Sequence, residues 1–552
     1  MIERSGAQIL VDQLKLHGVD TAFCVPGESY LHVLDALYHA RNHIRLIVNR
    51  QEGGAAFAAE AYGKLTGKPG ICFVTRGPGA ANASVGIQTA HYDSTPMILF
   101  VGQVSRAHAG REAFQEIDYP QMFGKMTRWV AQIEDARRIP EFISRAFHLA
   151  VSGRPGPVVL ALPVDMQADV VTVPDADPYR RARAYPAPDD MDTLRQWLAA
   201  AERPLMIVGK GGWTPEATRD IEAFARANNL PTIAAFRSQD LIDNHADQYV
   251  GFTGVGMSPE LGRRIRDSDL LLVVGSRLDQ LSTRDYTLVD IPRPAQRFIH
   301  VFPDPDELGR VYQTDLSINA TMPEFATAAR SLAPVEGSKW AEWAGAGREA
   351  YLAYNQSVPA PGAVNISEII NHIRQNTPAD TIFTNGAGIY TAWCHRFLSF
   401  SLPRTQIAPI NGVMGYGVPA AVAAKVIYPG KTVVSIAGDG CFLMNGQELA
   451  TAVQYELNIV FIVINNSMYG SIRMHQERHF PGNVYGTTLT NPDFAAYARA
   501  FGAYGEVVEE TAAFPAAFER AITADKPALI ELRVDPEALT PDSTLSDIRH
   551  RK

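Results

Sequence analysis

Short, uninterrupted apolar segments recur along this chain of 552 residues, and many of them end at a glycine or a polar residue. Residues 71–75 and 97–101 are two such segments. Segments of this length without polar alternation are typical of parallel strands that helices cover on both faces. Helix-like stretches separate them along the sequence. We therefore expect an α/β protein that is built from doubly wound parallel sheets.

The predicted strands fall into three blocks, and a typical length of about 100–200 residues per domain also indicates about three domains. Polar or proline-containing stretches at residues 167–190 and about 334–363 are predicted as linkers. We place the domains at residues 1–166, 190–333 and 362–540. The predicted strands are residues 71–75, 97–101 and 158–163 in the first block, 204–209, 270–275 and 298–301 in the second, and 381–384, 432–437 and 459–464 in the third.

The composition argues against several classes of partner. The formal net charge is −9 and no run of Lys or Arg forms a basic stripe, so a nucleic-acid partner is not expected. A membrane partner is not expected either, because no stretch of about 18 apolar residues could span a bilayer and the first residues lack the apolar core of a signal peptide. The four cysteines are far apart, and we expect them to be reduced thiols in a cytoplasmic protein.

Two polar motifs follow neighbouring predicted strands of the third block. Gly438-Asp439-Gly440 ends one strand, Asn465-Asn466 ends the next, and residues 445–453 are predicted to form a helical crossover between them. Glycines allow backbone N–H groups to approach a phosphate, and the oxygens of Asp439 and Asn466 suit Mg²⁺. Either motif alone is more often a simple turn. Together, at one edge of a sheet, they indicate a site for Mg²⁺ and phosphate.

These motifs resemble the diphosphate-binding signature of thiamine-diphosphate enzymes. Further segments resemble the acetolactate synthase group of that family, and they occur in the family's order along nearly the whole chain. These segments are residues 25–27, 50–53, 77–79, 113–116, 153–158, 415–421 and 447–452. The resemblance implies a pyrimidine-binding, a central and a diphosphate-binding domain in the order of the three blocks. It also implies thiamine diphosphate and Mg²⁺ as cofactors, and a homodimer at minimum, commonly a homotetramer.

The resemblance assigns roles to single residues. The carboxyl at the position of Glu52 binds the cofactor's aminopyrimidine and promotes proton removal from the thiazolium carbon, so we expect Glu52 to be mostly buried with its acid form favoured by desolvation. Its alternative is an ordinary acidic residue in the first turn of a helix. Met414 would hold the cofactor bent, and its alternative is a methionine that fills the core.

Further roles concern the cofactor, the metal and the substrate. The implied cofactor-binding residues are Pro26, Glu52, Gly77, Gly388, Gly412, Met414, Gly438, Asp439, Gly440, Cys441, Asn466, Met468, Tyr469 and Gly470. The metal ligands would be Asp439, Asn466 and the carbonyl of Met468. Residues implied in catalysis or substrate binding are Glu52, Phe114, Gln115, Arg473 and His475. Residues 385–388 depart from the family's Asp-Val-Gly-Gln.

The chain resembles the acetolactate synthase group less closely at positions that would face the substrate and in the central block. His475 replaces the family's Trp, which puts the usual 2-ketobutyrate preference in question, and Arg128 stands where the family often has Lys. Arg473 would bind a carboxylate or form a surface ion pair. His475, His479 and His91 are either acid–base groups or ordinary loop histidines. Central segments keep only part of the FAD-binding pattern, and residues 204–212 form a glycine-rich turn that is weak support for a nucleotide. FAD is possible, but we do not expect tight binding.

The resemblance implies an enzyme that decarboxylates a 2-oxo acid such as pyruvate and joins the remaining acyl unit to a second carbonyl. One alternative is a 2-oxo-acid decarboxylase or an acyl-CoA lyase on the same scaffold. Another is a non-catalytic subunit that only binds the cofactor. The presence of Glu52 together with an intact metal motif argues against the last alternative.

Overall fold

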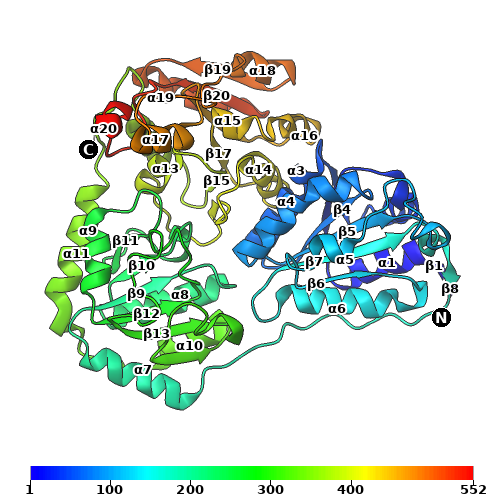
Figure 1. The fold of residues 1–552 in the computed structure, drawn as a ribbon, viewed down its shortest axis with the longest axis horizontal. Coiled ribbons are helices and arrows are strands. Elements are labelled where there is room, and N and C mark those ends of the chain that lie inside the picture. The colour runs from blue at the N-terminus through cyan, green and yellow to red at the C-terminus, as the bar shows by residue number, and fades with distance from the viewer. Residues whose placement is uncertain (1, 551–552) are drawn as a thin grey trace. The chain divides into compact units, whose positions relative to one another are not determined.

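The computed structural model describes residues 2–550, whose backbone forms three six-stranded parallel sheets and one short antiparallel pair (Figure 1). The predicted fold class is therefore confirmed. None of the helices in these residues is long and apolar enough to cross a membrane. Internal contacts divide the chain into two compact units. The first unit comprises residues up to 182 with 422–427 and 450–455, and the second comprises residues 183–421, 428–449 and those from 456 onward.

The sheet of the first unit has the strand order β3-β2-β4-β5-β7-β6, and all neighbouring strands are parallel. The strands are β2 (Thr21–Cys24), β3 (Arg45–Val48), β4 (Gly70–Val74), β5 (Met97–Gln103), β6 (Trp129–Gln132) and β7 (Pro157–Pro163). The helices are α1 (Gly6–Leu16), α2 (Leu31–His39), α3 (Glu52–Thr66), α4 (Pro78–Asp93), α5 (Tyr119–Phe123) and α6 (Ile139–Val151). A short antiparallel pair joins β1 (Arg4–Ser5) to β8 (Val170–Val171). Helices α1 and α6 pack together, as do α3 and α4, so the apolar strands are covered by helices.

The second unit contains the central sheet, whose order is β11-β10-β9-β12-β13-β14 with parallel neighbours. Its strands are β9 (Pro204–Val208), β10 (Thr232–Ala234), β11 (Tyr249–Phe252), β12 (Leu270–Val274), β13 (Arg297–Phe302) and β14 (Leu316–Asn319). Its helices are α7 (Pro188–Ala200), α8 (Pro215–Ala227), α9 (Pro259–Asp267), α10 (Met322–Ser331) and α11 (Ala341–Tyr354). Two hydrophobic clusters, formed by alternate residues of the strands, give this sheet a core on each face.

The third sheet also lies in the second unit and has the order β16-β15-β17-β18-β20-β19, again with parallel neighbours. Its strands are β15 (Ile382–Asn385), β16 (Gln406–Ile407), β17 (Val433–Gly438), β18 (Val460–Asn465), β19 (Tyr504–Val508) and β20 (Ala528–Arg533). The helices in this part of the chain are α12 (Ile366–Gln375), α13 (Thr391–Phe397), α14 (Gly417–Ile427), α15 (Asp439–Phe442), α16 (Leu449–Gln454), α17 (Gly470–His479), α18 (Phe494–Ala500), α19 (Phe514–Ile522) and α20 (Leu545–His550). Residues 422–427 of α14 and nearly all of α16 belong to the first unit.

The first and third sheets share one topology. When the strands of each sheet are numbered along the chain, both sheets have the spatial order 2-1-3-4-6-5. The central sheet differs, because its order is 3-2-1-4-5-6. In each case the order reverses between two neighbouring strands, and open α/β sheets bind their ligands at the carboxyl ends of these strands. In the third sheet the reversal lies between β15 and β17.

The predicted strands agree with the structure, whereas one predicted linker does not. All nine predicted strands coincide with observed strands to within two residues at each end. Residues 172–187 form neither helix nor strand, as expected of a linker. The second predicted linker is wrong, because residues 334–363 contain α11. This helix forms because Ala344 and Tyr351 join the core of the central sheet. The predicted crossover near residues 445–453 is confirmed by α16 and the short 3₁₀ helix Gly446–Glu448.

Candidate active site

The two polar motifs of the third block meet at one edge of the third sheet. Strand β17 ends at Gly438 and is followed at once by α15, while β18 ends at Asn465. The two strands are parallel neighbours, and Gly438 pairs in register with Ile464. Asp439 and Asn466 therefore leave the sheet at the same edge. This is the arrangement that the order of the motifs predicted.

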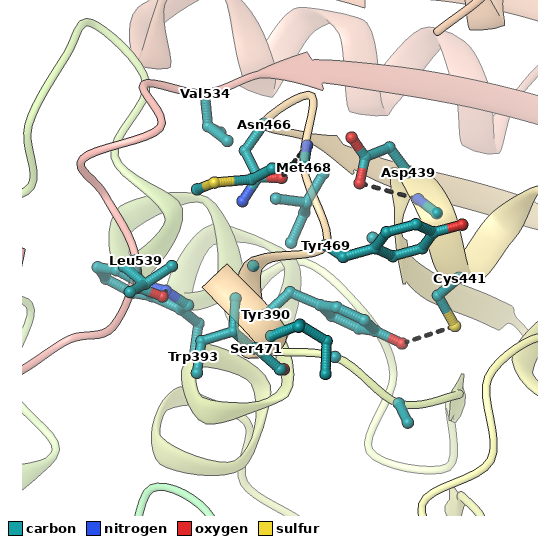
Figure 2. A pocket seen from close by; sticks show the side chains of 18 of the residues that line it. Tyr390, Trp393, Asp439, Cys441, Asn466, Met468, Tyr469, Ser471, Val534 and Leu539 are labelled. Carbon is teal, nitrogen blue, oxygen red and sulfur yellow. Dashed lines mark hydrogen bonds between the residues drawn. The ribbon is translucent and has the colours of Figure 1, made fainter. Parts of the chain in front are cut away.

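A cavity of about 250 Å³ opens at this edge (Figure 2). Eleven residues that the resemblance assigned to the cofactor line it. They are Gly388, Gly412, Met414, Gly438, Asp439, Gly440, Cys441, Asn466, Met468, Tyr469 and Gly470. Apolar side chains complete the wall, among them Ile389, Trp393, Val534 and Leu539. The cavity thus joins a polar end to an apolar one, as small-molecule sites commonly do.

Asp439 lies at the polar end and is only 3% exposed. One carboxylate oxygen accepts a hydrogen bond from the N–H of Gly440 at 2.8 Å, and the other accepts one from the side-chain amide of Asn491 at 2.7 Å. Burial raises the pKa of Asp439 above its usual value. A bound cation would favour the ionised form again, because its charge offsets the desolvation.

The oxygen donors around Asp439 fit Mg²⁺. The side-chain oxygen of Asn466 lines the cavity and accepts a hydrogen bond from the N–H of Met468 at 3.3 Å. Ser467 between them has a φ of 55°, so the chain turns back and Met468 also faces the cavity. Within residues 2–550 no three Asp, Glu, His or Cys side chains are grouped to hold a metal. One carboxylate with neutral oxygens suits Mg²⁺, which takes its remaining ligands from phosphate and water.

The two adjacent asparagines have different surroundings. Asn465 donates to the carboxylate of Glu531 at 2.8 Å and accepts from the side chain of Asn491 at 2.9 Å. Asn491 therefore bridges Asn465 and Asp439. Asn491 was not predictable from the sequence, because it lies far from both motifs in a loop. Only the packing of its loop against β17 and β18 reveals its position.

The backbone of the cavity approaches closely at several glycines. A Cβ atom on Gly440 would lie 2.6 Å from the ring of Tyr469, and one on Gly470 would lie 2.6 Å from Ile389. Gly412 has a φ of 69°, in the left-handed region that favours glycine. These positions leave backbone groups near the cavity uncovered by side chains. They are the groups that the resemblance assigned to the diphosphate and the aminopyrimidine.

Cys441 and Tyr390 form a buried pair beside this backbone. The Tyr390 hydroxyl lies 3.5 Å from the Cys441 sulfur and accepts a hydrogen bond from the N–H of Gly386 at 3.0 Å. The sulfur also accepts a hydrogen bond from the N–H of Gly415 at 3.3 Å. Burial raises the pKa of Tyr390. The pair links the segment after β15 to α15.

Met414 fits both of its predicted alternatives. Its side chain lines the cavity, and it also packs against the hydrophobic core of the third sheet. It is only partly buried. A flexible thioether in this position can adjust to a ligand without leaving the core.

Glu52 lies in the first unit, at the first position of α3. Its carboxylate accepts a hydrogen bond from the side chain of Asn82 on α4 at 3.0 Å. Gly79 lies beside it, since a Cβ atom there would be 3.6 Å from a Glu52 oxygen. The expectation that Glu52 is mostly buried agrees with the single chain, in which this residue is neither exposed nor fully buried. Asn82 was not identified from the sequence, since the contact depends on how α3 packs on α4.

The other predicted residues of the first unit gather at the carboxyl ends of its strands. Gly77, after β4, has a φ of 34°, and a Cβ atom there would lie 2.6 Å from the carbonyl oxygen of Gln115. Phe114 is 74% exposed, and the guanidinium of Arg76 lies 5.7 Å from its ring centre. Pro26, after β2, is exposed. Gly77 and Gln115 are thus brought together, whereas Phe114 projects outward.

Arg473 and His475 lie on α17, which follows the Asn466 turn. Arg473 pairs with the buried carboxylate of Glu477 at 2.8 Å, and Arg549 pairs with the same carboxylate at 2.8 Å. The hydrogen bonds from Arg549 and Arg473 lower the pKa of Glu477 to about 2. This pair is largely buried, since the side chains of Arg473 and Glu477 are 14% and 1% exposed, so it differs from the surface ion pair of the alternative, and the role of Arg473 at a substrate carboxylate stays a prediction. His475 is exposed, and its ring stacks on that of His479 with 6.3 Å between centres.

Two further residues singled out from the sequence have contacts in the first unit, the candidate acid–base residue His91 and Arg128, which stands where the family often has Lys. The main-chain carbonyl of His91 accepts a hydrogen bond from the guanidinium of Arg154 at 2.6 Å. The side chain of Arg128 packs over Gly156, where a Cβ atom would lie 3.0 Å from it. Neither contact involves a reacting group.

The reversal point of the central sheet is filled by the chain's own side chains. It lies between β9 and β12, where Gly209 and Gly275 follow the two strands. The indole N–H of Trp213 donates to the carbonyl of Gly209 at 2.6 Å. A Cβ atom on Gly275 would lie 2.8 Å from Met322 and 3.2 Å from Trp213. Open α/β sheets bind nucleotides at this position, so these residues do not fit an FAD that binds there.

Comparison with known proteins gives matches along most of the chain. Three family models match, described as the N-terminal TPP binding domain (residues 4–122), the central domain (191–329) and the C-terminal TPP binding domain (386–532) of thiamine pyrophosphate enzymes. The acetolactate synthase isozyme 2 large subunit of Escherichia coli (strain K12) is 30% identical over 96% of both chains. The acetolactate synthase large subunit of Corynebacterium glutamicum is 31% identical over 99% of this chain and 90% of its own length. That of Parasynechococcus marenigrum is 32% identical over 96% and 87%.

Proposed function

Because the chain belongs to the thiamine pyrophosphate enzyme family and is an enzyme similar to acetolactate synthases, we propose that it is a carboligase for 2-oxo acids such as pyruvate. The supporting observation is the cavity at the third sheet, where Asp439, Asn466 and Met468 converge. The alternative of a non-catalytic subunit has no support in these residues.

Mg²⁺ would be held by Asp439, Asn466 and the carbonyl of Met468. The backbone groups at Gly388, Gly440, Cys441 and Gly470 would bind the diphosphate, since side chains leave this part of the cavity open. Asn491 would fix the orientation of Asp439 through its hydrogen bond. Hydrogen bonds to a metal ligand from a residue that does not itself touch the metal orient that ligand and tune the metal affinity.

The aminopyrimidine would be bound by the backbone of Gly412 and by Met414 of one copy, and by Glu52 of a second copy with that copy's Pro26 and Gly77 beside it. When bound, thiamine diphosphate supplies an electron sink for the departure of the carboxyl group of a 2-oxo acid. Glu52 would exchange a proton with the ring nitrogen that it contacts. The apolar residues Ile389, Trp393 and Leu539 would exclude water from the reacting carbonyl.

We further propose that Glu52 of one copy serves the cavity of another copy, so that the active unit is a homodimer at minimum and a homotetramer when complete. The half-buried state of Glu52 in a single chain suits a carboxyl whose remaining surface a second copy covers. Two inactive variants, Glu52→Gln and Asp439→Ala, test this when they are co-expressed. A mixed dimer would contain one intact site and regain activity. Persistent inactivity of isolated mixed dimers would contradict the proposal.

The central domain would not bind FAD tightly, because Trp213 and Met322 fill its reversal point. This proposal is tested by adding FAD to the purified protein and following flavin fluorescence after gel filtration. Co-elution of flavin in a stoichiometric amount would contradict it.

A second candidate, a simple 2-oxo-acid decarboxylase, is favoured by the pairing of Arg473 with Glu477. This guanidinium is already engaged, so it is a poor partner for the carboxylate of an acceptor 2-oxo acid. Product identity separates the candidates. The purified protein with thiamine diphosphate and Mg²⁺ is given a panel of 2-oxo acids, beginning with pyruvate, and followed by proton NMR. A coupled hydroxyketo product supports the carboligase, and free aldehyde alone supports the decarboxylase. If none of the 2-oxo acids is consumed, acyl-CoA substrates are tested next.

A further inference from the structure

A polar segment of the central sheet is buried within the second unit. It follows β10 and comprises residues 237–240, which we call the 237–240 segment. Its four side chains belong to Arg237, Ser238, Gln239 and Asp240, and each is at most 3% exposed. Four consecutive polar side chains are rarely buried unless each has defined partners. The partners of three of them lie on the third sheet.

Gln239 and Asp240 bind the edge strand β16. The side chain of Gln406 makes two hydrogen bonds to Gln239: its oxygen accepts from the backbone N–H of Gln239 at 2.9 Å, and its amide donates to the side-chain oxygen of Gln239 at 3.0 Å. One carboxylate oxygen of Asp240 accepts from three successive backbone N–H groups, of residues 404, 405 and 406, at 2.9, 3.2 and 3.3 Å. A strand of two residues is too short to be held by its own ladder, so the 237–240 segment fixes its position.

Arg237 reaches beyond the strand to the loops that form the cavity. Its guanidinium donates to the carbonyl of Gly386 at 2.7 Å and also to the carbonyl of Pro409. Gly386 begins the turn that leads to Gly388, and Pro409 begins the loop that leads to Gly412 and Met414. Arg237 has a φ of 56°, a conformation that residues other than glycine rarely adopt. Such conformations persist where surrounding contacts hold them, often at functional sites.

We propose that Arg237 is a positioning residue for the cofactor cavity, because it holds the Gly386 and Pro409 carbonyls together and so sets the separation of the two cavity loops. This inference rests on the proposed assignment of the cavity to thiamine diphosphate. It gives the central domain a role in cofactor binding. The coupling is reciprocal. The free energy by which the attached 237–240 segment strengthens cofactor binding equals the free energy by which bound cofactor stabilises the attachment of that segment.

Arg348 offers a matched control within the same unit. Its guanidinium also donates to main-chain carbonyls, those of Asn244 at 2.9 Å, Tyr249 at 3.0 Å and His245 at 3.1 Å. None of these residues lines the cavity. Loss of either arginine leaves buried carbonyls without their donor, which lowers stability in both variants. Only loss of Arg237 should alter the cavity loops.

The experiment compares Arg237→Met, Arg237→Lys and Arg348→Met in the full chain. Thiamine diphosphate is titrated in saturating Mg²⁺ by calorimetry, and the thermal midpoint is measured with and without cofactor. We expect Arg237→Met to raise the Kd for thiamine diphosphate about tenfold or more, within the usual range of coupling between sites. Arg348→Met should leave the Kd near that of the unaltered protein. At saturating cofactor, kcat of Arg237→Met should fall much less than its cofactor affinity.

Equal Kd values for the unaltered protein and the Arg237 variants would overturn the inference. An equal rise in Kd for Arg348→Met would also overturn it, because the effect would then be general destabilisation. If Arg237→Met does not fold, Arg237→Lys tests the inference instead. Lysine keeps the positive charge but lacks the planar guanidinium that donates to both carbonyls, so the Kd for thiamine diphosphate should still rise. Failure of the unaltered protein to bind thiamine diphosphate would instead refute the assignment of the cavity, and so separates the two proposals.

Discussion

Replacement of Asn491 by Ala should weaken Mg²⁺ binding without removing a metal ligand. The side-chain amide donates to Asp439 at 2.7 Å and to Asn465 at 2.9 Å, so the change deletes both hydrogen bonds. Loss of a residue that hydrogen-bonds a metal ligand typically costs about 10- to 100-fold in metal affinity, or about 1.4–2.7 kcal/mol. The bond to Asp439 dominates, because a hydrogen bond to a carboxylate contributes more than one to an amide.

In the assay, Mg²⁺ is titrated at a fixed concentration of thiamine diphosphate, and the bound cofactor is measured at each Mg²⁺ concentration. Asn458→Ala is the matched control, because this residue donates to Asp525 at 2.9 Å on the exposed side of the same sheet. We expect the Mg²⁺ midpoint of Asn491→Ala to rise at least about tenfold. The midpoint of Asn458→Ala should stay unchanged. A midpoint for Asn491→Ala within twofold of the unaltered protein would refute the reasoning that Asn491 orients Asp439.

Three further outcomes are expected. Glu52→Gln should keep Mg²⁺-dependent cofactor binding but lose most turnover; full turnover would remove Glu52 from the mechanism. Asp439→Ala should weaken cofactor binding only when Mg²⁺ is present, and calorimetry showing unchanged affinity would disprove the metal assignment. Arg549→Met should lower the thermal midpoint. Because the folded pKa of Glu477, about 2, lies below its ordinary value near 4.5, the difference should be full above pH 4.5 and shrink as pH falls toward 2. A difference that does not vary with pH would contradict this.

Apolar runs identify nine of the twelve inner strands of the three sheets, missing β2, β10 and β20, and none of the outer ones. All six edge strands, β3, β6, β11, β14, β16 and β19, escaped prediction. Several of them are only partly buried, because one side of an edge strand lacks a neighbouring strand. They therefore carry mixed side chains instead of a continuous apolar segment. Helix α11 was missed for a related reason, since only a few of its residues face the core.

The metal site was predictable because its residues directly follow apolar strands, whose carboxyl ends meet at one edge. Asn491, Asn82 and Arg237 were not predictable, since each acts through a contact with a segment distant in sequence. Arg473 forms a contact within its own helix that the sequence did not indicate. Its position in the motif suggested a substrate carboxylate, and the structure adds a partner that was not predicted, Glu477 one helical turn further along, at a spacing where ion pairs are common in helices.

The contacts of the 237–240 segment also bear on the order in which the chain folds. Arg237 and Pro409 are separated by 172 positions, and the central sheet leaves the ribosome before the loops that Arg237 binds. Contacts over such separations form late, because the intervening chain must first be ordered. The central sheet is thus positioned to act as a template on which β16 docks. A fragment that begins at residue 362 would leave the N–H groups of residues 404–406 without the Asp240 carboxylate. During synthesis, the cavity loops that Arg237 contacts would therefore reach their final positions only after the central sheet has formed.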